Sequence, residues 1–157
     1  MKRLTKHLIL VPCTEESLPQ AFDEDYPVGP HIAAYIDELK NDPSALGWGP
    51  WFIISRETLT IIGDAGFKGV PDKNGAVETG YSIIPSEQNK GLATEAVAAL
   101  IDWACSTGEA SIVRAECHKD NVPSIRVLEK TGMVREKEVE SMIYWEKPGN
   151  RVNAEDS

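Results

Sequence analysis

The chain has 157 residues, of which 41% are hydrophobic and 26% charged, a composition typical of a globular protein. Its net charge of −9 at pH 7 argues against general nucleic-acid binding, which needs clustered lysine and arginine. No apolar run approaches the roughly 20 residues that cross a bilayer, so no membrane partner is expected. The length predicts a single domain over residues 1–148, followed by a disordered tail at 149–157.

The negative charge is concentrated between Pro12 and Pro50. This segment holds eight acids against one base, Lys40, and therefore carries −7 of the −9 net charge. The acids are Glu15, Glu16, Asp23, Glu24, Asp25, Asp37, Glu38 and Asp42. Such a segment suits a cationic partner. Two solvated helix faces would explain the same pattern.

Cysteine and histidine show no pattern typical of a metal site or a disulfide framework. The cysteines are odd in number, far apart and in no C-x-x-C pair, which is typical of a protein from the reducing cytoplasm. The histidines are isolated along the chain, so no metal is expected. The residues concerned are Cys13, Cys105 and Cys117, and His7, His31 and His118.

In chain order, the first half predicts one strand, two helices and then an antiparallel meander. A strand over His7–Val11 precedes a helix over Glu15–Phe22 that Thr14 caps. Apolar residues at helical spacing predict a second helix over His31–Lys40. The three strands that follow are expected over Trp51–Ser55, Leu59–Phe67 and Val77–Ile84. Asn74-Gly75, between the last two strands, is a turn signal.

The second half predicts alternating helices and strands. A helix with one apolar stripe begins after Gly91 and ends near Gly108. It is followed by a strand over Ser111–Cys117, a helix over Pro123–Lys130, and strands over Val134–Lys137 and Ser141–Glu146. The resulting order, β-α-α-β-β-β-α-β-α-β-β, describes a mixed α/β domain with a late parallel crossover.

The main functional signal is the loop Gln88–Ala93, QNKGLA, between a strand and a helix. A helix N-terminus leaves about four backbone N–H groups unpaired and carries roughly half a positive charge, so it binds phosphates. Neither the P-loop pattern nor G-x-G-x-x-G occurs here. The loop does fit [QR]-x-x-G-x-[GA]. A plain turn that needs a glycine would give the same local pattern.

Two longer blocks resemble the GNAT acyl-CoA N-acyltransferases, most closely the ribosomal-protein N-terminal acetyltransferase branch. They are VETGYSIIPSEQNKGLATEAVAALIDWA and AECHKDNVPSIRVLEKTGM, and the segments LILVP and GDAGFKG are similar to the early strands of that branch. The resemblance covers nearly the whole chain. It implies the mixed α+β GNAT fold, a central mixed sheet of about six to seven strands flanked by about four helices. It also implies that two parallel strands splay apart at the cofactor cleft.

The same resemblance implies acetyl-CoA as acyl donor and no metal. The main chain of Ile83 and Ile84 is expected to hold pantetheine and polarise the thioester carbonyl, although core packing would equally explain both residues. The implied pyrophosphate site comprises Gln88, Asn89, Lys90, Gly91, Leu92, Ala93 and Thr94. Asn121 and Ser124 match the family's Asn-x-x-Ser pattern, which contacts the pantetheine arm and thiol region. Asn121 is equally well placed as a helix N-cap.

For catalysis, Glu78 lies where many family members carry a general base. Free α-amino groups titrate near 8 and lysines near 10.4, so an acceptor amine must lose a proton before it attacks. An exposed strand carboxylate is the alternative interpretation of Glu78. Leu128 stands where many members carry a tyrosine that protonates the departing thiolate. Its candidate substitutes are Ser124, Tyr81, Tyr144 or water, or the thiolate leaves without an acid.

The sequence therefore predicts an N-acetyltransferase that moves an acetyl group from acetyl-CoA to a primary amine by direct attack on the thioester. The acidic segment, with Trp48 and Trp51 nearby, favours a cationic acceptor: a protein N-terminus, a lysine, a polyamine or another small amine. Core packing would equally explain both tryptophans. A non-catalytic CoA-binding regulatory protein and a transferase for another acyl group are the alternatives. The sequence is silent on oligomeric state; dimers are common in this family, which leaves a homodimer as one alternative.

Overall fold

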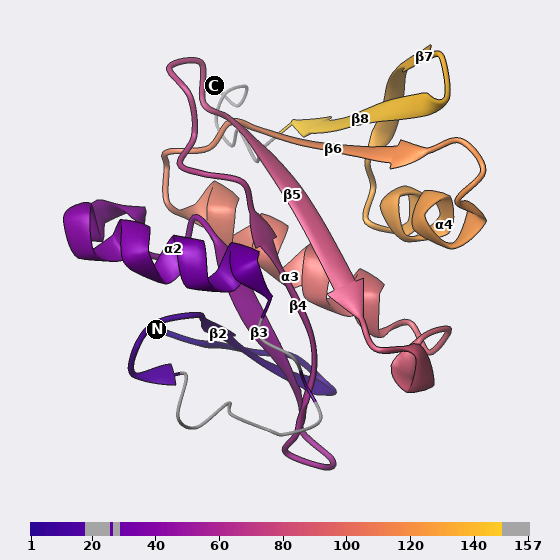
Figure 1. The fold of residues 1–157 in the computed structure, drawn as a ribbon. Helices are drawn as coiled ribbons and strands as arrows, with labels where there is room; N and C mark the ends of the chain where they lie inside the picture. The colour runs from indigo at the N-terminus through magenta and orange to yellow at the C-terminus, as the bar shows by residue number, and fades with distance from the viewer. Residues whose placement is uncertain (18–25, 27–28, 149–157) are drawn as a thin grey trace.

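The computed structural model describes residues 1–17, 26 and 29–148, which form an eight-stranded sheet with three α-helices (Figure 1). The strands are β1 Arg3–Leu4, β2 Leu8–Pro12, β3 Pro50–Ser55, β4 Ile61–Phe67, β5 Ala76–Ile83, β6 Ile112–His118, β7 Val134–Val139 and β8 Met142–Pro148. The helices are α2 Pro30–Asn41, α3 Leu92–Ser106 and α4 Val122–Lys130, with 3₁₀ turns η1 Pro43–Ala45 and η2 Pro85–Glu87.

The strands lie in the order β1-β2-β3-β4-β5-β6-β8-β7. Strands β5 and β6 are parallel, and the other neighbouring pairs are antiparallel. Parallel neighbours need a long crossover, and here α3 supplies it. The mixed GNAT-type sheet predicted from the sequence is confirmed, with eight strands rather than six to seven.

Helix α2 covers one face of the sheet, and α3 and α4 cover the other (Figure 1). Strand β4 is buried along its whole length because helices lie on both of its faces. Strand β6 alternates between buried and exposed residues, as expected of a strand covered on one face only. The sheet thus separates two hydrophobic cores: one lies beneath α3 and α4, and the other lies beneath α2.

Trp103 of α3 is the centre of an aromatic cluster in the larger core. Its ring lies 4.6 Å from Trp48, 5.2 Å from Trp51 and 5.9 Å from Phe67, measured between centroids. Trp48 is 2% exposed and Trp51 is 0% exposed. Such rings stabilise the core. Core packing accounts for Trp51, whereas Trp48 packs in the core and also lines a pocket on the α2 face of the sheet.

Most predicted element boundaries agree with the structure to within one or two residues. The exceptions have physical causes. Leu59 has a φ of 59° in the turn before β4, so that strand begins at Ile61. Strand β1 has only two residues and gives no periodic signal. The predicted helix Glu15–Phe22 extends into 18–25, and the predicted tail lies at 149–157, both outside the described residues.

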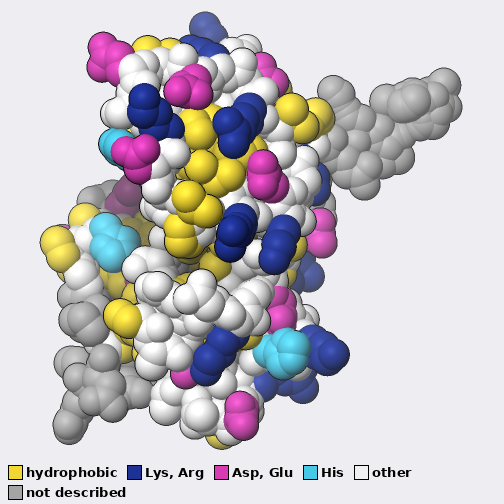
Figure 2. Space-filling model, turned by 90° about the vertical axis from the view of Figure 1, so that its right-hand side faces the viewer, with side chains coloured by type: hydrophobic (Ala, Val, Ile, Leu, Met, Phe, Trp, Pro, Cys, Tyr) yellow, Lys and Arg dark blue, Asp and Glu magenta, His cyan; other side chains and the backbone are white. Residues whose placement is uncertain are grey.

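On the face beside α4, lysine and arginine side chains lie among aspartate and glutamate side chains around an apolar patch (Figure 2). Within residues 1–17, 26 and 29–148, no helix is long and apolar enough to cross a membrane.

Glu95, in the first turn of α3, attaches that helix to the N-terminal strands. Its carboxylate accepts hydrogen bonds from the Thr5 hydroxyl, from the His7 backbone N–H at 2.7 Å and from His7 Nδ1 at 2.8 Å. Burial alone would raise the pKa of Glu95, but these donors outweigh burial and hold it below its ordinary value.

Replacing Glu95 with glutamine should destabilise the fold by about 1–2 kcal/mol at pH 7, because hydrogen bonds to a charged acceptor are lost. Because the folded-state pKa is lowered, this contribution is present above the unfolded-state pKa and is lost as pH falls through the folded-state pKa. Urea unfolding of both proteins between pH 7 and pH 3 measures it. Glu109→Gln, at an exposed position, is the control. A difference that does not shrink in acid contradicts the assignment.

Candidate cofactor and acceptor site

The parallel strands β5 and β6 pair over only three residues. The partners are Ala76 with Ile112, Val77 with Val113, and Glu78 with Arg114. Strand β5 continues to Ile83 and β6 to His118, each held by its outer neighbour. The two strands therefore part after Glu78, which confirms the splay implied by the resemblance. A parted edge offers main-chain hydrogen-bonding groups to a ligand.

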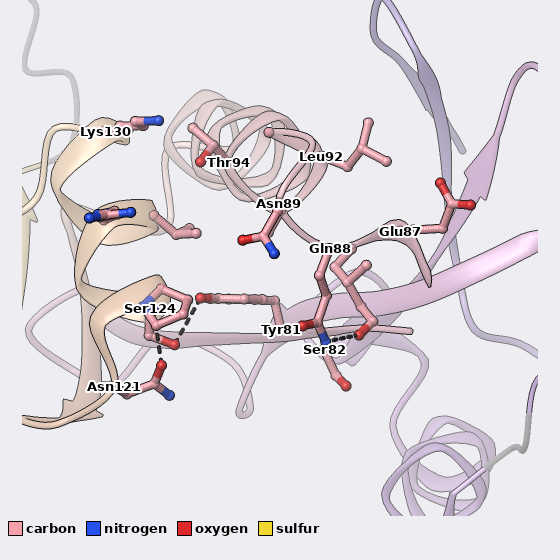
Figure 3. A pocket seen from close by; sticks show the side chains of 16 residues that line it. Tyr81, Ser82, Glu87, Gln88, Asn89, Leu92, Thr94, Asn121, Ser124 and Lys130 are labelled. Carbon is pink, nitrogen blue, oxygen red and sulfur yellow. Dashed lines mark hydrogen bonds between the residues drawn. The ribbon is translucent and has the colours of Figure 1, made fainter. Parts of the chain in front are cut away.

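A cleft of about 640 Å³ lies beside this gap, between the start of α3 and α4 (Figure 3). The predicted residues that line it are Ile83, Gln88, Asn89, Gly91, Leu92, Ala93, Thr94, Asn121 and Ser124. Further lining residues are Tyr81, Ser82, Glu87, Pro123, Arg126, Val127 and Lys130. Residues of the two sequence blocks are thus brought together in one cleft.

The loop that begins α3 is shaped for close approach. Gly91 caps the helix with a φ of 80°, a conformation that favours glycine. A Cβ built there would meet nothing within 4 Å, so the space above it is open. The Gln88 side chain donates to the carbonyl of Ile83 at 2.8 Å and ties the loop to the end of β5. The backbone N–H groups of the first turn therefore face a site open to an anion.

The opposite wall is α4. The Asn121 side chain accepts from the backbone N–H of Ser124 at 3.2 Å, so it does act as the N-cap. The Tyr81 hydroxyl donates to Ser124 Oγ at 2.9 Å and spans the gap between β5 and α4. Burial raises the pKa of Tyr81, and the bond to Ser124 partly opposes that shift.

Sequence reasoning missed Arg126 and Lys130, which lie one helical turn apart on α4 and line the cleft. They bring positive charge to the wall that faces the phosphate-type loop. The only signal for them is their i, i+4 spacing within the Asn-x-x-Ser helix, and basic residues at that spacing are ordinary on exposed helices.

Three predicted site residues do not line this cleft. The Lys90 ammonium lies 3.2 Å from Glu87, and the Ile84 N–H donates to Ile62. Glu78 contacts Lys68, with 2.9 Å between Oε2 and Nζ. Glu78 lines a third hollow, together with Tyr144 and other residues of β6, β7 and β8.

A second pocket, of about 690 Å³, opens on the α2 face of the sheet. It shares Tyr81 and Ser82 with the first cleft, so the two hollows meet at the middle of β5. Its lining is mainly apolar, with His31, Glu38, Asp64 and Lys68 as the charged or titratable groups besides tyrosine. Of the acids in the segment Pro12–Pro50 that the structure describes (Glu15, Glu16, Asp37, Glu38 and Asp42), Glu38 alone lines it. The described residues contain no cluster of three potential metal ligands.

Residues 7–134 match the family model described as the acetyltransferase (GNAT) domain. The uncharacterized N-acetyltransferase YjdG of Bacillus subtilis (strain 168) is 35% identical over 114 residues, which are 73% of this chain and 68% of YjdG. The ribosomal-protein-S5-alanine acetyltransferase from Vibrio fischeri has a TM-score of 0.74 at 17% identity, over 96% of this chain and 98% of that one.

A spermidine N-acetyltransferase from Vibrio cholerae, solved with CoA and spermine, has a TM-score of 0.73 at 13% identity, over 94% of this chain and 98% of that one. At such identities the two solved structures show a common fold. The family model and the relative in Bacillus subtilis carry the assignment further. The chain belongs to the GNAT family of acetyl-CoA-dependent N-acetyltransferases.

Proposed function

We propose that this enzyme transfers an acetyl group from acetyl-CoA, held between β5 and α4, to a primary amine that enters from the second pocket. The observation that carries the proposal is the meeting of the two hollows at Tyr81 and Ser82. A donor in one hollow and an acceptor in the other would come together at that point, and direct transfer needs such proximity.

The cleft residues fit acetyl-CoA, whose thioester supplies the activated acyl group. The loop Gln88–Thr94 would hold the pyrophosphate on the N-terminus of α3, where the missing Cβ of Gly91 leaves room. The main chain at Ile83 would face the pantetheine, whereas the Ile84 N–H, which donates to Ile62, is not available to polarise the thioester carbonyl. Asn121 and Ser124 would contact the arm from α4. Lys90 pairs with Glu87 and does not line the cleft, so it would attract the pyrophosphate only through its positive charge on the loop.

Glu78 is the general base that the sequence predicts. Because it lines neither hollow and is paired with Lys68, it would act through water. Leu128 is 3% exposed in the core and has no proton to give. The Tyr81 hydroxyl, bonded to Ser124 in the cleft, is the best-placed proton donor to the departing thiolate.

The acceptor that the second pocket suits best is a cationic amine, since Asp64 and Glu38 line it. Solved structures of similar fold include a ribosomal-protein-S5-alanine acetyltransferase and a spermidine N-acetyltransferase. Protein N-termini and polyamines are therefore among the acceptor amines to be tested. A non-catalytic CoA-binding protein and a transferase for a longer acyl group are the alternative functions. Cytoplasmic location and a homodimer complete the proposal.

Release of free thiol from acetyl-CoA tests the function. The amine panel comprises basic N-terminal peptides, lysine peptides, polyamines and aminoglycosides. Wild type should release thiol with one amine class. If Glu78 takes the proton of the amine, Glu78→Gln lowers that rate at least about 100-fold while CoA binding survives. Full activity of the variant contradicts Glu78 as base. Tight CoA binding without release from any amine favours the non-catalytic alternative.

Gly91→Ala should raise the Kd for coenzyme A about tenfold, since the methyl group enters the space proposed for the pyrophosphate. Gly108→Ala is a matched control: Gly108 also has a φ of 80° with nothing within 4 Å, but it lies after the other end of α3. Both variants carry the same backbone strain. Isothermal titration calorimetry measures the two Kd values, and equal weakening in both would show that strain alone is responsible.

A further inference from the structure

A histidine, an aspartate and a tyrosine form a hydrogen-bonded cluster in the second pocket. Asp64, on β4, is one of few buried polar side chains and accepts from the Tyr26 hydroxyl on one carboxylate oxygen. Its other oxygen, Oδ1, lies 3.1 Å from His31 Nε2 at the start of α2. Burial and the bond to Asp64 raise the pKa of Tyr26, which therefore stays a neutral donor. The carboxylate is thus held from two sides.

The imidazole of His31 is oriented by this contact and lines the pocket, with its Nδ1 edge beside Gly29. Because Nε2–H donates to the carboxylate, Nδ1 carries the free lone pair. The His31 side chain is 58% exposed, whereas that of Asp64 is 11% exposed. A Cβ on Gly29 would lie only 3.0 Å from Nδ1, so the glycine keeps that edge of the ring uncovered.

The cluster lies beside the point where the two hollows meet. Asp64 pairs with Ser82 across the β4–β5 ladder, and Ser82 lines both hollows. His31 and Asp64 both line the second pocket, which Glu78 does not. An acceptor amine in this pocket would therefore be next to an imidazole held by a carboxylate, the arrangement that suits general base catalysis.

We propose that His31, positioned by Asp64, accepts the proton of the acceptor ammonium group. The N–H bond breaks, its electron pair remains on nitrogen as the attacking lone pair, and the proton joins Nδ1. The buried carboxylate of Asp64 stabilises the imidazolium that forms, which then returns its proton to solvent. The new N–C bond replaces the C–S bond, whose electron pair leaves on sulfur. The acetylated nitrogen then loses its second proton to water, and the thiolate takes a proton from the Tyr81 hydroxyl, which water restores. This inference rests on the proposed acetyl transfer and gives His31 the step that the sequence predicts for Glu78.

His31→Gln is the decisive variant, and His118→Gln is its matched control. His118 is also exposed, at 51%, and lies near Asp120, but it lines neither hollow. We expect His31→Gln to lower kcat for the amine at least about 100-fold at pH 7, with the KM for acetyl-CoA within about twofold of wild type. His118→Gln should match wild type.

The pH profile of kcat/KM for the amine separates a proton acceptor from a structural residue. Wild type should lose activity in acid through a titration that is absent from His31→Gln. The other titratable or charged groups around His31 are Asp64, Tyr26, Tyr35, Glu38, Lys68 and, behind Asp64, Cys13. Asp64→Asn should lower kcat at least about 100-fold, because the amide neither fixes the imidazole tautomer nor stabilises its cation as the carboxylate does.

Gly29→Ala tests the same atom without changing the histidine. Its φ of −76° accepts alanine, and the new methyl would crowd Nδ1, so kcat should fall at least about tenfold at unchanged CoA affinity. Retention of activity and of the acid limb in His31→Gln overturns the inference and leaves acetyl transfer intact, with Glu78→Gln then expected to be the inactive variant. Absence of thiol release from wild type with every amine overturns the proposed function and this inference with it.

Discussion

The site depends on one constraint in the sheet: β5 and β6 must separate from each other while each stays hydrogen-bonded to its other neighbour. Each is held along its outer edge, β5 by β4 as far as Ile83 and β6 by β8 as far as His118. Between them only three residue pairs join before the strands part. The antiparallel ladders on both sides keep the backbone ordered while the inner edges face a gap. Hydrogen-bonding groups that a continuous sheet would use are therefore left for a ligand.

The alternation of side chains along β5 explains how one strand can serve two substrates. Successive residues point to opposite faces of a sheet. Tyr81 reaches toward α4 and Ser124, whereas Ser82 lies beside Asp64 on the α2 face. The two hollows, on opposite sides of the sheet, thereby share a wall of two consecutive residues. Helices on both faces complete the hollows, and the aromatic cluster around Trp103 keeps the sheet rigid beneath them.

Features with a local signal were predictable from the sequence, and features made by distant contacts were not. Gly91 and the loop around it predict an anion-binding helix N-terminus, and that prediction located the cleft. The pairing of His31 with Asp64 joins residues 33 positions apart on a helix and a strand whose register the sequence does not reveal. Trp48 and Trp51 had two open interpretations because Trp103, the ring that buries them, lies far along the chain.

The bond between Tyr81 and Ser124 has a consequence for cofactor entry. It crosses the gap between β5 and α4 as a single contact of 2.9 Å between neutral hydroxyls, because burial keeps the tyrosine protonated. Such a latch contributes about 0.5–1.5 kcal/mol, so breaking it would weaken binding by roughly two- to twelvefold at most. A contact of this size across the gap is therefore compatible with tight coenzyme binding.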